Sequence, residues 1–77
     1  MRVLEEPIRV WTRNNTPTLI KRGHSVYHVK RLMNYWVIQG RWWVNEERRL
    51  YMRLETDRGM MEVFCRENEW ILSKIWD

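Results

Sequence analysis

Apolar and polar residues alternate along most of the chain, which predicts β-strands. From residue 49 to residue 56 every second side chain is aliphatic, and Leu50, Met52 and Leu54 share one face. A period of two residues is the pattern of a strand that turns one face to the core. On the last segment we expect Ile71 and Ile75 on one face. The alternating segments are 7–13, 16–22, 24–31, 41–44, 49–56, 61–66 and 70–76, and on the last of them the other face would carry Trp70, Leu72 and Trp76.

Short turn signals separate these segments. Asn14-Asn15 and Glu67-Asn68 suit tight turns, since Asn tolerates a positive φ. Gly23 and Gly59 close two further turns, and Asp57-Arg58-Gly59 suits a type I turn with a glycine bulge. Five to seven closely spaced strands predict an all-β fold, in which a small antiparallel meander curls into a barrel or roll. We expect residues 1–77 to form one domain.

One stretch breaks the alternation. Val29, Leu32, Met33 and Trp36 are separated by three or four residues, which fits one short helical turn or a 3₁₀ turn near residues 30–36. A bent strand fits the same spacing.

The composition favours a folded intracellular domain. Its six Trp, three Tyr and one Phe give a short chain enough apolar surface to bury. Cys65 is the single cysteine, so a disulfide framework is excluded. The first residues lack the apolar stretch of a signal peptide, and no apolar run is long enough to span a membrane. We therefore expect a cytoplasmic location and no membrane partner.

No catalytic or metal-binding arrangement is evident in the sequence. Ser25 and Ser73 lie in no nucleophile motif, and the three glycines form no phosphate-binding loop. His24 and His28 would lie about 13 Å apart on a strand, too far for one metal ion. Cys65 occupies an inward strand position, where a thiol behaves as a small apolar group. We expect a binding protein, with no enzymatic activity and no cofactor.

Charge and aromatic residues suggest what is bound. The net charge is +4, and residues 1–45 hold eight basic and two acidic residues. Arg9, Trp11 and Arg13 alternate on one strand face, and aromatic rings beside arginines suit single-stranded DNA or RNA, whose bases stack while phosphates pair with guanidinium groups. The candidate nucleic-acid-binding residues are Arg9, Trp11, Arg13, Lys21, Arg22, Lys30, Arg31, Arg41 and Trp42.

The same residue types have two other uses. Tyr51 and Arg53 also share an outward face and fit the same nucleic-acid pattern, but arginine packed on tryptophan is often only an intramolecular cation–π contact. Trp and Arg also dominate protein–protein interfaces. Adjacent Trp42 and Trp43 must point to opposite faces of a strand, so at least one faces away from the core.

The order and spacing of many residues resemble a known family. They are Glu6-Pro7-Ile8-Arg9-Val10, Arg22-Gly23, Tyr27, Val29, Trp36, Trp42-Trp43, Arg49-Leu50-Tyr51-Met52-Arg53-Leu54, Gly59, Glu62-Val63-Phe64, Trp70-Ile71-Leu72 and Ile75-Trp76-Asp77. The chain resembles small bacterial domains of unknown function that occur free-standing and near the C-terminal end of catalytically degenerate Y-family DNA polymerase homologues. Trp76 departs from that pattern, since Tyr is expected there.

The resemblance implies a setting in DNA damage tolerance and supplies no catalytic residues. Two functions are therefore expected. The first is a non-catalytic nucleic-acid-binding module that is accessory to DNA repair or translesion synthesis. The second is a protein–protein interaction module that binds a Y-family polymerase-like partner or itself through exposed Trp residues or free sheet edges.

Overall fold

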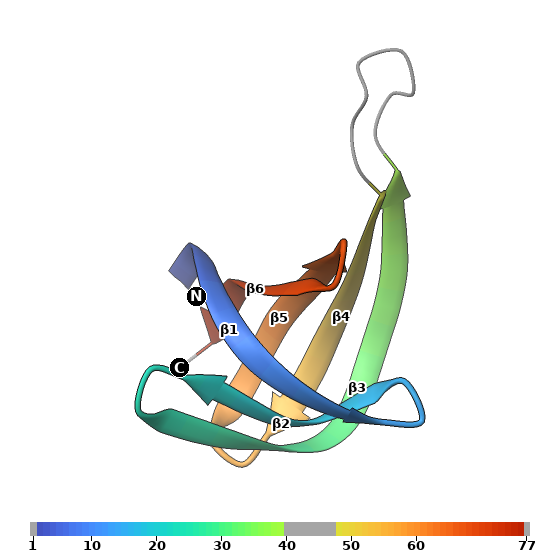
Figure 1. The fold of residues 1–77 in the computed structure, drawn as a ribbon. Helices are drawn as coiled ribbons and strands as arrows, with labels where there is room; N and C mark the ends of the chain where they lie inside the picture. Colours follow the sequence, from blue (N-terminus) through green and yellow to red (C-terminus); the bar gives the residue numbers. More distant parts are fainter. Residues whose placement is uncertain (1, 40–47, 77) are drawn as a thin grey trace.

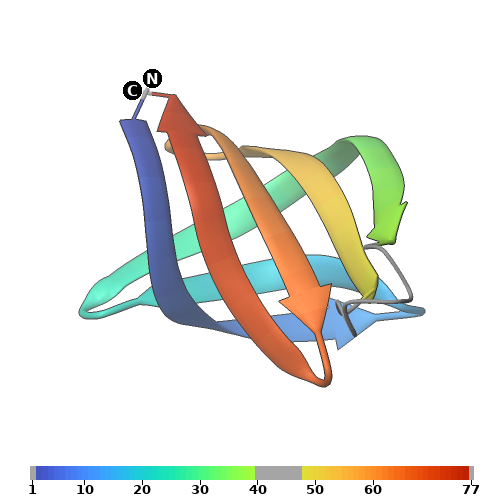
Figure 2. The same cartoon turned by 90° about the horizontal axis from the view of Figure 1, so that it is seen from above.

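The computed structural model describes residues 2–39 and 48–76, which form six antiparallel strands closed into a barrel. Each strand pairs with the next along the chain, and β6 pairs with β1 to complete the ring. Figures 1 and 2 show this ring from two sides. The strands are β1 (Arg2–Arg13), β2 (Thr16–Arg22), β3 (Ser25–Gln39), β4 (Arg48–Thr56), β5 (Gly59–Arg66) and β6 (Glu69–Trp76). The predicted all-β meander is confirmed.

Two long strands change partners along their length. In β1, residues 2–8 pair with β6 and residues 9–13 pair with β2. In β3, residues 25–28 pair with β2, and the remainder pairs with β4. Figure 1 shows both strands bending across the barrel. Two hydrogen bonds hold β3 at His28, where it changes from β2 to β4 as its partner. The Asp57 N–H donates to the His28 carbonyl oxygen, and the His28 N–H donates to Asp57 Oδ1, each at 3.0 Å.

The turns follow the predicted chemistry. Asn14 and Asn15 both have positive φ, as do Glu67 and Asn68, which matches the two-residue turns that suit the twist of hairpins. Gly59 has a φ of 113°, and a Cβ atom built there would lie 2.8 Å from the carbonyl oxygen of Trp76. Glycine is therefore required at this position by conformation and by space.

The barrel interior holds one apolar core. Alternate residues of β4 and β5 enter it as predicted, and Leu54, Val63 and Leu72 have almost no exposed surface. Burying a side chain of this size contributes roughly 1.5–3 kcal/mol, so a few residues supply most of the stabilisation. The buried core residues are Ile20, Tyr27, Met52, Leu54, Met61, Val63, Leu72 and Ile75.

The helical turn predicted near residues 30–36 is wrong, because β3 is extended throughout. Its register shifts between Val29 and Arg31 and again between Leu32 and Asn34. Each bulge adds one residue to the inward repeat. The first bulge therefore places Val29 and Leu32 on one face with a spacing of three, which imitates a helical period.

A similar shift corrects the assignment on β6. Glu62 pairs with Lys74 while Val63 pairs with Leu72, which leaves Ser73 as an extra residue. As a result Leu72 and Ile75 both join the core, although they were predicted on opposite faces.

The strand predicted at 41–44 lies outside the described residues. No helix long and apolar enough to span a membrane occurs in the described part of the chain.

We expect Gly59→Ala to lower the free energy of unfolding by about 2–4 kcal/mol, since it forces a strained φ and places a methyl group against a backbone oxygen. Gly23→Ala is the matched control. Gly23 also has a positive φ but nothing within 4 Å of a built Cβ, so the loss should be about 1 kcal/mol. Urea unfolding measures both, and equal losses would contradict the steric argument.

Candidate nucleic-acid interface

The outer surface of β1, β2 and the first part of β3 forms what we call the basic face. Two rows of side chains cross it, because residues opposite one another in register share a face. The two rows are Arg9–Lys21–Val26 and Trp11–Leu19–His28. Neighbouring strands lie about 4.8 Å apart and alternate residues of one strand about 7 Å apart. The cationic row therefore runs directly beside the row that holds the indole ring.

Trp11 presents an open ring on this face. Its side chain is 46% exposed, and within the described residues no aromatic or cationic side chain packs on the ring. The bulge beside it is held by a hydrogen bond from the Thr18 hydroxyl to the Trp11 carbonyl oxygen, at 3.1 Å. An exposed tryptophan that its own protein does not cover is available to stack with a planar ligand.

The cations of the basic face are also unneutralised. Arg9 and Lys21 are exposed, and neither forms an ion pair with any described residue. No Asp or Glu occurs between residues 7 and 45, so the strand segments of this face contain no carboxylate of their own. Their positive charge is therefore directed to solvent or to a ligand.

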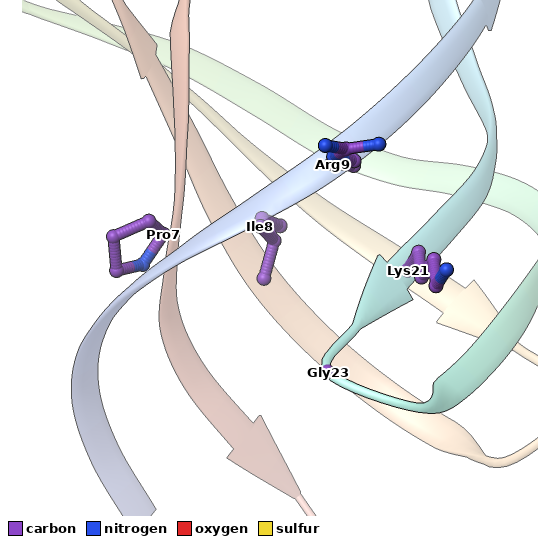
Figure 3. Close-up of a pocket in the computed structure, with 5 residues that line it drawn as sticks. All are labelled: Pro7, Ile8, Arg9, Lys21 and Gly23. Carbon is purple, nitrogen blue, oxygen red and sulfur yellow. The ribbon is translucent and has the colours of Figure 1, made fainter.

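Two open hollows flank β1 on the basic face. One, of about 440 Å³, is lined by Arg9 and Lys21 with Gly23 at the turn below them (Figure 3). The other, of about 420 Å³, lies on the opposite side of the strand, between Trp11 and the turn at Asn68. Pro7, Ile8 and Arg9 line both hollows. Arg9 thus stands on a ridge between two depressions, where one guanidinium group can reach a ligand in either.

Five of the other predicted site residues divide into three groups. Arg13 at the end of β1 and Lys30 at a bulge of β3 are exposed and extend the positive charge beyond the two rows. Arg31 is also exposed, but its Nε donates to the Glu55 carboxylate at 2.7 Å. Arg41 and Trp42 lie outside the described residues.

Arg22 has a structural role instead of a place on the basic face. Its Nε donates to Glu6 Oε2 at 2.8 Å, which links β2 to β1 just beyond the point where their backbones stop pairing. Its hydrogen bonds with Glu6 and then with Tyr27 raise the pKa of Arg22 above its usual value. Arg22 is therefore less available for a phosphate contact than Arg9 and Lys21, and its place among the nucleic-acid-binding residues stays a prediction.

A second outer surface, over β3–β6, uses arginine and aromatic residues for its own packing. Trp36 and Tyr51 stack with centroids 5.6 Å apart, and the Arg53 guanidinium lies between the Trp36 and Trp76 rings, at 5.7 and 5.1 Å from their centroids. Below it, Glu62 is only 3% exposed and contacts Arg53 and Lys74 at 3.5 and 3.8 Å. This arginine–aromatic cluster is the intramolecular alternative that the sequence left open, and it applies here, not at Trp11.

Leu19 and His28 were missed as members of the basic face. Leu19 lies opposite Trp11, and His28 lies opposite Leu19. Their positions follow from the register of the β1–β2 and β2–β3 hairpins. The turn signals at Asn14 and Gly23 could have been used to predict that register from the sequence. Together they provide an apolar and a polar surface beside the exposed ring.

A third hollow, of about 490 Å³, lies at one end of the barrel and has a mixed lining. Its apolar part is Leu50, Met52, Cys65 and Trp70, and its polar part is Thr12, Asn15 and Asn68. Burial raises the pKa of the Cys65 thiol, so the uncharged thiol predominates at neutral pH. The described residues contain no group of three or more His, Cys, Asp or Glu that could hold a metal ion.

Comparisons of the chain with protein-family models, curated proteins and solved structures gave no match.

Replacement of Arg53 tests the structural role of the arginine–aromatic cluster. We expect Arg53→Ala to destabilise the protein by about 2 kcal/mol, because it removes two ring contacts and one partner of a buried carboxylate. Arg31→Ala is the control, since it breaks an exposed ion pair worth at most about 0.5 kcal/mol. Thermal and urea unfolding report both values, and a similar small loss in both variants would contradict this role.

Proposed function

We propose that this chain is a non-catalytic module that binds single-stranded nucleic acid on its basic face. The observation that carries the proposal is the exposed Trp11 ring beside Arg9 and Lys21, two cations without an ion-pair partner in the described structure. Single-strand binding requires a ring on which a base can stack and nearby positive charge for the backbone. Both requirements are met within two adjacent rows of side chains.

Single strands suit this face better than a duplex. The bases of a duplex are stacked on one another, so a ring such as Trp11 can reach a base plane only in an unpaired strand. The hollows on either side of Arg9 are shallow depressions beside a ridge, and a flexible strand can follow such a surface. Leu19 and Val26 add apolar area for sugars and base edges.

The biological setting we propose is DNA repair or translesion synthesis. The resemblance to domains associated with Y-family polymerase homologues supports it, and template strands exposed at a stalled polymerase are single-stranded. In that setting the module would hold the unpaired strand near a polymerase-like partner without taking part in catalysis.

Removal of two charges from the basic face tests the phosphate contacts. We expect Arg9→Gln with Lys21→Gln to weaken binding of a fluorescent single-stranded oligonucleotide. It should also reduce the slope of log K against log salt concentration by about 1.4, since each phosphate contact on a single strand contributes roughly 0.7. Fluorescence anisotropy over a salt series measures both quantities.

The matched control is Arg31→Gln with Arg58→Gln, which removes the same charge from residues that already have partners in Glu55 and Tyr27. It should leave the slope nearly unchanged. If both double variants behave alike, binding depends only on net charge, and the assignment to the basic face is wrong.

Truncation of the exposed ring tests stacking separately from charge. We expect Trp11→Ala to weaken oligonucleotide binding by about 1–3 kcal/mol, the usual contribution of one stacked base, with an unchanged salt slope. Tyr35→Ala removes another exposed aromatic residue that lies off the basic face and should bind as the parent does. Wild-type affinity in a folded Trp11→Ala protein would remove the stacking element of the proposal.

A further inference from the structure

The second half of β3 has a neighbour on one side only. After Val29 it pairs with β4, whereas β2 pairs only as far as His28. No other described strand lies along its second edge, and Figure 1 shows this part of β3 extending beyond the barrel beside β4. Every second backbone N–H and C=O group of a strand points toward such an edge, where it can pair with another strand.

This edge is regular and uncharged over its last five residues. From Tyr35 to Gln39 the register with β4 is unbroken, and the sequence Tyr-Trp-Val-Ile-Gln contains no charge and no proline. Tyr35 is 63% exposed, and Val37 and Ile38 are 43% and 48% exposed. This described part of β3 thus leaves apolar residues of high β-propensity in water at an edge where a strand could be added to them.

The rest of the same edge is protected. Two bulges interrupt the segment from Val29 to Asn34, and the Asn34 side chain accepts a hydrogen bond from the backbone N–H of Tyr35 at 2.8 Å. Lys30 and Arg31 add charge. Bulges and charged residues are common means of blocking edge pairing, so the open part of this edge begins after the Tyr35 N–H, which Asn34 already binds, and runs to Gln39.

The free edge of β1 makes a useful comparison. Residues 2–8 pair with β6 but not with β2, so they also have an unpaired side. That edge carries Glu5, Glu6 and Pro7 and a register shift after Val3, and the Glu6 side chain is bonded to Arg22 across the gap. Because the β1 edge is protected and the β3 edge is exposed, we expect the β3 edge to pair with another strand.

We propose that the β3 edge pairs with the same edge of a second copy of this chain, antiparallel and centred on Val37. This pairing places Val37 opposite Val37, Trp36 opposite Ile38, and Tyr35 opposite Gln39. Aromatic and β-branched residues opposite one another are favourable cross-strand pairs. Because both copies use the same surface, the interface is closed and produces a dimer.

Charge favours a second copy over a charged partner. The segment offers no charge that would select an acidic or basic peptide. In the antiparallel arrangement Arg31 of each copy lies six residues from the centre, about 20 Å along the strand, so the two cationic ends stay apart. Five paired residues make a small interface, so we expect a weak dimer whose population rises with protein concentration.

Sedimentation equilibrium over a concentration series tests the proposal. The unmodified protein should shift from monomer to dimer, and Val37→Glu should raise the dimer dissociation constant at least about tenfold, since it places two like charges opposite each other at the centre. Val3→Glu is the matched control. It changes another exposed valine by the same charge but lies on β1, and it should leave the dissociation constant unchanged.

A direct measurement covers the case in which Val37→Glu fails to fold. In a Cys65→Ala background, Val37→Cys should form a disulfide between copies under mild oxidation, because directly opposite residues lie within the Cα separation that a disulfide needs. Val26→Cys, on the part of β3 that pairs with β2 and lies outside the proposed interface, should not. A protein that stays monomeric up to about 1 mM, a dimer that Val37→Glu leaves intact, or equal cross-linking at both positions would overturn the proposal.

Discussion

Closure of the barrel depends on two strands that each pair with different neighbours along their length. A chain of 77 residues cannot build two full sheets, so β1 and β3 each serve both halves of the ring. This arrangement surrounds the core with a closed ring of paired strands. It also leaves unpaired edges. Where β1 or β3 changes from one neighbouring strand to another, each part of the strand has one side without a partner. The hollow beside Arg9 and the open edge of β3 both arise at such points.

The division of the arginines follows from the same geometry. Over β3–β6 the sheet is continuous, so long side chains from adjacent strands meet and form a second packed layer that covers Phe64, 2% exposed, and Glu62. Over β1–β2–β3 the sheet is narrow, and Arg9 and Lys21 form no ion pair and no cation–π contact with any described residue. The arginines of the arginine–aromatic cluster are paired within the protein. Arg9 and Lys21 on the basic face have no such partners among the described residues, so their charge is available to a ligand.

Local chemistry accounts for what could be predicted from the sequence. The alternation at Leu50–Leu54 and the positive φ of Asn14 and Gly59 are properties of single residues and their near neighbours. A bulge is not a local property. An extra residue such as Ser73 can be recognised only from its pairing with the neighbouring strand. The sequence therefore placed Ile75 on the wrong face and suggested a helix in β3. It also could not show that Trp11 is exposed while Trp36 is covered, since only packing reveals that Trp36 is stacked on Tyr51.

The two surfaces can be used at once because they engage different parts of a strand. In the proposed binding mode a base would stack on the face of β1 through a side chain, whereas in the proposed dimer a second chain would join the edge of β3 through backbone groups. Pairing of two β3 edges would join two barrels without covering Trp11, Arg9 or Lys21. Two basic faces held in one particle can engage the same nucleic-acid strand, and the second contact then forms at a high effective concentration. A face with few cations gains most from this arrangement, because a single contact area of that size binds weakly at physiological salt.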